Sequence, residues 1–100
     1  MRSLALLLAL AIPAAAEVGA ERKTALEHMV TQDCGSCHGL TLKGGLGSPL
    51  TAGALTNAEP ETLATIILDG LPGTAMPPWR PLLTEEEAIW IARYLKEQPE

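Results

Sequence analysis

Three stretches of the chain place apolar residues at the three- and four-residue spacing of helices that face a core. They predict helices at residues 21–33 and 60–69, and a third helix that begins at Thr84 and ends near Lys96. No stretch alternates apolar and polar residues as a strand does, so we expect an all-α fold with three main helices. The expected buried stripes are Ala25, Leu26, Met29 and Val30, then Leu63, Ile66, Ile67 and Leu71, then Ala88, Ile91, Ala92 and Leu95.

Start and stop signals agree with these three helices. Thr84 followed by Glu87 forms a capping box, and Pro60 suits the first turn of a helix. Gly39 and Gly70 mark the ends of the first and second helical runs. The segments between the helices are expected to be irregular, since they are rich in glycine at 40–53 and in proline at 71–83.

The first residues of the chain have the pattern of a secretion signal. Arg2 supplies a positive charge, residues 4–12 form an apolar run, and residues 14–16 offer a small-residue cleavage site. The run is too short to span a bilayer, so we expect residues 1–16 to be a signal peptide rather than an anchor. Residues 17–100 then form one exported, periplasmic domain without a membrane span.

The most informative motif is Cys34-Gly35-Ser36-Cys37-His38, which has the spacing of a covalent haem attachment site. On a helix the two cysteines and the histidine share one face, so each thiol can add to one vinyl group while the imidazole binds iron. A thioredoxin-like dithiol belongs beside a βαβ pattern, and a zinc site needs four ligands, whereas the chain has only two cysteines and two histidines. A disulfide between Cys34 and Cys37 would close a short, strained loop. We therefore expect one covalently attached haem c, with its iron bound by His38.

Met76 is the predicted distal ligand of that iron. It lies 38 residues after His38, and the two prolines that follow it restrict the backbone around it. A thioether suits haem iron and raises its reduction potential, as in electron-transfer cytochromes. The alternatives are that Met76 fills the core, and that the sixth position is open or taken by His28 or Met29. Both of these residues lie on the helix that delivers the cysteines, from which the opposite haem face is hard to reach.

Charge and composition narrow the function further. The formal charge is −5, or −6 once Arg2 leaves with the signal peptide, and no basic patch is visible, which argues against a nucleic-acid binder. The acidity fits a partner with a basic docking face, or serves only to keep a small secreted protein soluble.

Large aromatic side chains are few, so the haem must fill the centre of the domain. No acid–base machinery lies beside Met76, so we do not expect an enzyme. Trp79 and Arg80 are candidates to reach a haem propionate, the alternatives being packing and solvation.

The chain resembles the class I c-type cytochromes over residues 22–98. The attachment motif, a methionine in a proline-rich loop and the closing helix at 91–96 carry the resemblance. It implies the small fold in which three main helices wrap around one covalently attached haem. The family often has a glycine and an aromatic residue where this chain has Leu26 and Val30, so the first and last helices are expected to cross more widely, or at Ala25.

Residues 33–50 and 69–81 look like those of the small NirC-type cytochromes found with the haem-c, haem-d nitrite reductase of denitrifying bacteria. The resemblance implies a periplasmic redox protein whose partner is nitrite reductase. Such a protein supplies electrons to the enzyme, or acts in maturation of its specialised haem with a labile distal ligand; the sequence does not choose between them. The resemblance also implies that a backbone carbonyl at Pro49 accepts the free N–H of the proximal histidine. We expect a monomer.

Overall fold

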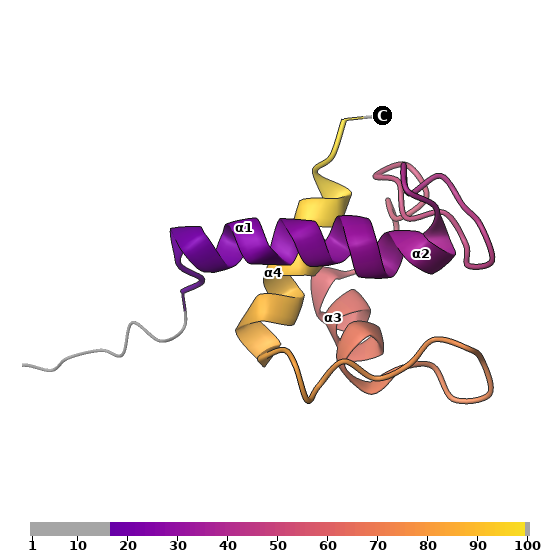
Figure 1. The fold of residues 1–100 in the computed structure, drawn as a ribbon. Coiled ribbons are helices and arrows are strands. Elements are labelled where there is room, and N and C mark those ends of the chain that lie inside the picture. The colour runs from indigo at the N-terminus through magenta and orange to yellow at the C-terminus, as the bar shows by residue number, and fades with distance from the viewer. Residues whose placement is uncertain (1–16, 100) are drawn as a thin grey trace, which may run out of the picture.

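The computed structural model describes residues 17–99, which form helices joined by irregular segments (Figure 1). The elements are α1 (Ala20–Met29), the π-helical turn η2 (Val30–Cys34), α2 (Gly35–His38), α3 (Pro60–Asp69) and α4 (Glu85–Lys96). The first three run on without a break, as the single predicted helix at 21–33 and the motif after it. No strand occurs among the described residues, which agrees with the predicted all-α class. The predicted signal peptide, 1–16, lies outside the described residues.

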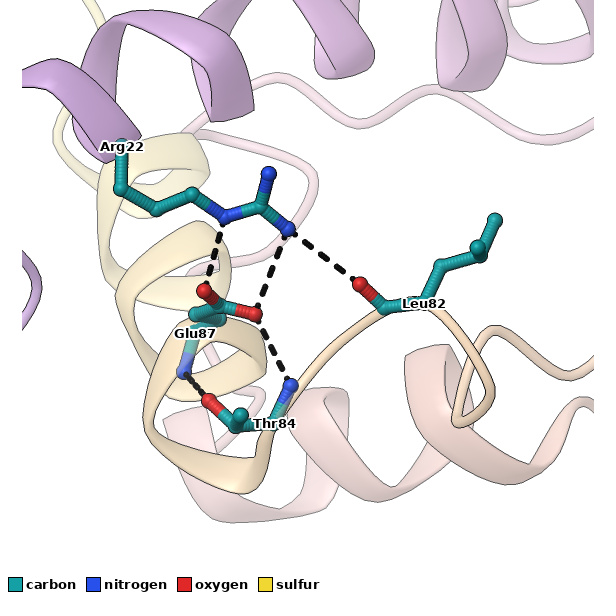
Figure 2. A network of polar contacts seen from close by, with 4 residues as sticks. All are labelled: Arg22, Leu82, Thr84 and Glu87. Atoms are coloured by element: carbon teal, nitrogen blue, oxygen red, sulfur yellow. Dashed lines mark hydrogen bonds and ion pairs between the residues drawn. The ribbon is translucent and has the colours of Figure 1, made fainter.

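The predicted start and stop signals lie at observed helix ends, although the first helical stretch runs from Ala20 to His38 and so extends past the predicted 21–33. Pro60 occupies the first turn of α3, and Gly70 follows the helix with a φ of 72°, which favours glycine. Gly39 follows α2 in the same way, with a φ of 94°. At the start of α4 the backbone N–H of Glu87 donates to Thr84 Oγ1 at 3.1 Å, and the N–H of Thr84 donates to Glu87 Oε1 at 2.9 Å (Figure 2). The predicted capping box is therefore confirmed.

The core forms where α4 crosses α1 and packs beside α3 (Figure 1). Leu26 and Val30 of α1 and η2 are almost fully buried. Ala25 is exposed, so its predicted place in the stripe, and at the helix crossing, is wrong. Leu26 and Val30 lie four residues apart and define the buried line of the helix, which leaves Ala25 to one side of it. Met29 is half-buried. The stripe of α4 is buried as predicted, through Ala88, Ile91, Ala92 and Leu95.

The predicted stripe of α3 is wrong in part. Ala64 and Leu68 are the buried residues of this helix, whereas Leu71 is 45 % exposed. The chain leaves the helix at Gly70, so Leu71 cannot continue its buried face. The other members of the predicted stripe are half-buried: Leu63, Ile66 and Ile67.

An ion pair ties the start of α1 to the start of α4 (Figure 2). Arg22 Nε donates to Glu87 Oε2 at 2.7 Å, and Arg22 Nη2 donates to the carbonyl oxygen of Leu82 at 3.2 Å. The Glu87 side chain is 16 % exposed and that of Arg22 is 40 % exposed, so water screens the pair incompletely. The pair joins the N-terminal part of the chain to the segment that leads into the last helix.

The end of α4 holds the last turn of the long segment 39–59. Lys96 is half-buried, and its ammonium group donates to three backbone carbonyl oxygens. The distances are 2.7 Å to Leu55, 3.3 Å to Thr56 and 2.7 Å to Ala58. The lysine therefore satisfies three carbonyl oxygens that no helix or strand pairs, and it fixes the segment against the helix.

Candidate functional site

The attachment motif lies at the end of the first helical stretch. Cys34 is the last residue of η2, whereas Cys37 and His38 belong to α2. The Cys34 side chain is half-buried against the core and Cys37 is exposed, and both thiols are free. Burial, and to a lesser extent the negative charge of Asp33, raise the pKa of the Cys34 thiol to about 11. At neutral pH the Cys34 thiol is therefore protonated.

A backbone carbonyl fixes the orientation of the His38 ring. His38 Nδ1 lies 2.6 Å from the carbonyl oxygen of Ser48. A carbonyl oxygen only accepts, so Nδ1 carries the proton and Nε2 keeps the lone pair that a metal ion binds. The prediction that Pro49 supplies this carbonyl is wrong by one residue. The acceptor belongs to the peptide bond before the proline, where the proline ring restricts the backbone of Ser48 to extended conformations.

Glycines let this segment lie directly against α2. A Cβ atom on Gly47 would come within 2.7 Å of His38 Cε1 and 2.8 Å of His38 Nδ1. A Cβ atom on Gly45 would come within 2.7 Å of the Cys37 carbonyl oxygen, which instead accepts the N–H of Gly47 at 2.7 Å. Sequence reasoning did not assign a role to Gly47 or Ser48. The signal that points to them is the density of glycines just before a proline, which indicates close backbone approach.

Met76 lies in the other irregular segment, between α3 and α4. Its side chain is half-buried, its N–H donates to Thr74 Oγ1 at 3.2 Å, and its carbonyl oxygen accepts from the N–H of Leu71 at 3.3 Å. In Figure 1, α2 lies between the segment 39–59 above it and the segment 70–84 below it. The segment that contacts His38 and the segment that carries Met76 thus extend to the same side of the molecule as the attachment motif.

The alternative distal ligands lie on or next to α1. His28 is exposed on that helix, and Met29 is half-buried against the core. Among the described residues no group of three or more histidine, cysteine, aspartate and glutamate side chains is placed to hold a metal ion. The two thiols and the imidazole of the attachment motif lie within five consecutive residues, at the end of the first helical stretch. This donor set suits a porphyrin with a covalent attachment and one axial nitrogen ligand.

Trp79 and Arg80 have contacts within the protein. Trp79 is half-buried and packs against the core. Arg80 is not simply solvated, because its guanidinium forms two hydrogen bonds with Asp69, Nε to Oδ1 at 2.7 Å and Nη2 to Oδ2 at 2.8 Å. Trp90 and Tyr94 stack on each other with ring centroids 5.1 Å apart, so these two aromatic side chains pack together.

Two hollows occur away from the attachment motif. One, of about 130 Å³, is lined by residues of 41–51 and by Gln98 and Pro99. The other, of about 210 Å³, lies between α3 and α4 and is lined in part by Arg80 and Glu85. Neither is the apolar hollow that covalent haem attachment leads one to expect beside the two cysteines, the histidine and Met76. We find no helix in residues 17–99 that is both long and apolar enough to cross a membrane.

Comparisons with known proteins give one consistent result. A protein-family model described as cytochrome c oxidase, cbb3-type, subunit III matches residues 21–95. Cytochrome c55X of Paracoccus denitrificans is 58 % identical over 97 residues, which cover 95 % of this chain and 94 % of the relative. A solved structure of the c-type cytochrome NirC has a TM-score of 0.78 and 48 % identity, and the match covers 80 % of this chain and 94 % of that one.

Two larger proteins contain a similar segment. Nitrite reductase of Stutzerimonas stutzeri is 34 % identical over 106 residues, which cover 93 % of this chain and 19 % of the reductase. The solved structure of dihydro-heme d1 dehydrogenase NirN in complex with DHE has a TM-score of 0.67 and 32 % identity, and the match covers 73 % of this chain and 16 % of that one. The likeness is therefore confined to a small part of each of these two proteins.

Proposed function

Because this chain belongs to the cytochrome c55X family of c-type cytochromes, we propose that it is a periplasmic monohaem carrier that donates electrons to dissimilatory nitrite reductase. As a cytochrome c it carries covalently bound haem c with iron, and it is an electron carrier rather than an enzyme. The similarity to a segment of nitrite reductase and to NirC supports the reductase as the redox partner. Residues 1–16 are a signal peptide in this proposal, and the exported domain acts as a monomer.

The residues that we propose to hold the haem are the four that the sequence predicts. Cys34 and Cys37 would hold the haem through thioether bonds to its two vinyl groups, and His38 Nε2 and Met76 would be the protein ligands of the iron. Haem held in this way would supply one-electron transfer, with the same two protein ligands in both oxidation states. The observation that carries this proposal is the hydrogen bond from His38 Nδ1 to the Ser48 carbonyl, at 2.6 Å, because it leaves Nε2 as the free ligand atom.

Solvent extraction tests the covalent attachment. In acidified organic solvent the haem should stay with the unaltered protein and leave a Cys34→Ala, Cys37→Ala double variant. Equal extraction from both proteins would show that the attachment is not covalent.

Met76 is tested by spectrum and potential. The oxidised protein should show the weak far-red band of methionine–iron coordination. Met76→His should abolish the band and lower the midpoint potential by on the order of 0.1 V, a fraction of the roughly 0.8 V that axial ligands control. An unchanged band and potential in Met76→His would remove Met76 from the ligand set.

A second candidate function is redox participation in maturation of the specialised haem of the reductase. The observation that favours it is the similarity to a segment of dihydro-heme d1 dehydrogenase. This role requires a distal ligand that exchanges easily, whereas the carrier role requires one that stays bound during electron transfer. The rate of ligand exchange at the iron therefore distinguishes the two functions.

A further inference from the structure

The segment that carries Met76 leaves the end of α3 and returns to the same place. The N–H of Trp79 donates to the carbonyl oxygen of Ile67 at 3.0 Å, and the N–H of Arg80 donates to that of Leu68 at 2.9 Å. Both carbonyls belong to the last turn of α3, where no further helical N–H is available to them. The two backbone hydrogen bonds therefore close residues 70–79 into a loop whose base is the C-terminus of the helix.

An ion pair lies across this base. Asp69 is the last residue of α3, and Arg80 is the first residue beyond the loop. Their side chains meet as a two-bond fork, with Arg80 Nε 2.7 Å from Asp69 Oδ1 and Nη2 2.8 Å from Oδ2. Arg80 Nη1 also lies 3.7 Å from Glu85 Oε2, on the first turn of α4. A planar, doubly hydrogen-bonded pair fixes direction as well as distance, so it restrains both ends of the loop.

Inside the loop, the backbone of Met76 and Pro78 lies close to Gly70, at the base of the loop. A Cβ atom on Gly70 would come within 2.8 Å of the Met76 carbonyl oxygen and 3.0 Å of Pro78 N. The N–H of Leu71 donates to the same Met76 carbonyl at 3.3 Å. The backbone at Met76 therefore rests on the residue that follows Asp69, and a movement of the base is passed directly to Met76.

We propose that Asp69 and Arg80 form a clamp that sets how easily Met76 leaves the haem iron. The inference rests on the proposed ligation by Met76. For the thioether to leave, the loop must move away from the haem, and a closed base limits that movement. Opening the clamp gives the loop more freedom and makes the distal position accessible more often. Asp69 and Arg80 are thus positioning residues, which act on the iron through the loop and do not touch it.

The test measures the rate at which imidazole displaces Met76 from the oxidised holoprotein, at imidazole concentrations where the rate no longer rises. Asp69→Asn and Arg80→Gln should each speed the displacement by about threefold, the scale expected for one partly exposed pair. The exchanged pair Asp69→Arg, Arg80→Asp should return the rate toward that of the unaltered protein. The matched control is Arg93→Gln, which removes an equal charge from another exposed pair between α3 and α4, with Arg93 Nη2 4.0 Å from Glu61 Oε2. It should leave the displacement rate unchanged.

The dependence of the displacement rate on ionic strength distinguishes an electrostatic clamp from a purely structural role of these residues. Because the pair is about half exposed, raising the ionic strength should speed displacement in the unaltered protein and in Arg93→Gln. It should have no such effect in Asp69→Asn, where the attraction is already absent.

The clamp is overturned if both single variants exchange at the rate of the unaltered protein while the far-red band is present. It is also overturned if Arg93→Gln speeds exchange as much as they do, because general loosening of the fold would then be the cause. Absence of the far-red band from the unaltered protein would overturn the ligation by Met76, and the clamp with it.

Discussion

The His38 ring lies against one short stretch of backbone, at Gly47 and Ser48. The Ser48 carbonyl accepts its Nδ1–H, and Gly47 lies against the ring where any side chain would collide. A strong acceptor on Nδ1–H makes the imidazole more electron-rich, which favours the oxidised iron and lowers the potential. If His38 binds the iron as proposed, these two residues set both the direction of the ring and its strength as a ligand.

Gly47→Ala should disturb this arrangement. The new methyl carbon would lie within 2.7 Å of His38 Cε1, so the ring or the loop must shift. We expect a cost of about 1–3 kcal/mol in the free energy of unfolding, as for overpacked positions. The hydrogen bond to Ser48 should lengthen, and the midpoint potential should rise. Denaturant unfolding and potentiometry measure these two effects.

The matched control for this change is Gly19→Ala. A Cβ atom at Gly19 meets nothing within 4 Å, so that variant should leave the potential unchanged. A potential in Gly47→Ala equal to that of the unaltered protein would show that the contact with the ring has no electronic consequence.

Single residues define the limit of what the sequence predicts about the site. The attachment motif is local, so its spacing alone indicates its chemistry. The carbonyl acceptor is different, because the path of the loop decides whether Ser48 or Pro49 faces the ring. Leu42 makes the same point. It adopts a φ of 62°, which favours glycine, while its carbonyl accepts the N–H of Leu50 at 2.8 Å. Tertiary contacts impose this conformation, and the residue type gives no sign of it.

At the scale of elements, the sequence predicts where helices begin and end, but it does not predict the π-helical turn inside the first helical stretch. The capping box of α4 and the proline and glycine that bound α3 are local signals, and each marks the residue where its helix begins or ends. The π-helical turn η2 has no comparable signal, since an i→i+5 hydrogen bond needs no particular residue type. It runs from Val30 in the buried stripe to Cys34 in the attachment motif, so its wider turn changes the direction of Cys34 relative to Leu26.

The Arg22–Glu87 pair should make the stability of the helix packing depend on pH. The hydrogen bond from Arg22 is the main cause that lowers the pKa of Glu87, and the backbone N–H of Thr84 acts in the same direction. A carboxyl whose pKa is lower in the folded state stabilises the fold above its unfolded pKa, about 4.3. That stabilisation is lost as the pH falls through the folded pKa.

Glu87→Gln isolates this effect, because glutamine can still accept the capping hydrogen bond from Thr84. Its control is Glu86→Gln, which removes the same charge from the same turn, where the described residues show no ion pair for Glu86. At pH 7, Glu87→Gln should be less stable than the control by about 1 kcal/mol. The difference should narrow as the pH falls below about 4. Thermal unfolding at several pH values measures it, and a difference that stays constant with pH would exclude the ion pair as its cause.

Over the whole molecule, charge and apolar surface are arranged differently. The chain carries a formal charge of −5, spread along its length. Among residues 17–99, the large exposed apolar side chains lie in two segments, 39–59 and 70–84: Leu40, Leu46, Leu71 and Leu82. Leu46 is 96 % exposed. In the proposed electron transfer, overall charge would therefore govern long-range steering toward the partner, and the exposed apolar side chains would govern close contact.

The contributions of charge and of apolar contact can be separated by measuring the rate of electron transfer to purified nitrite reductase. Stopped-flow spectroscopy monitors this rate as oxidation of the reduced cytochrome. If a basic face of the reductase attracts this acidic protein, the rate should fall by about tenfold between 0.01 and 0.3 M salt, as the Debye length shortens from roughly 30 Å. Leu46→Ser keeps the charge, so it should slow transfer at every salt concentration without changing the slope. Glu86→Gln removes one negative charge and no apolar surface, so it should make the transfer rate slightly less dependent on salt concentration.

The other possible results of the electron-transfer experiment also bear on the function of the protein. Fast transfer that does not depend on salt would keep the donor role and discard electrostatic steering, leaving the exposed leucines as the contact. An absence of transfer at any salt concentration would remove the donor role. Rapid displacement of Met76 by imidazole in the same protein would then favour haem maturation, because a ligand that leaves easily opens the iron to other chemistry. The two measurements together thus assign the chain to one function, since slow exchange with fast transfer fits only the carrier.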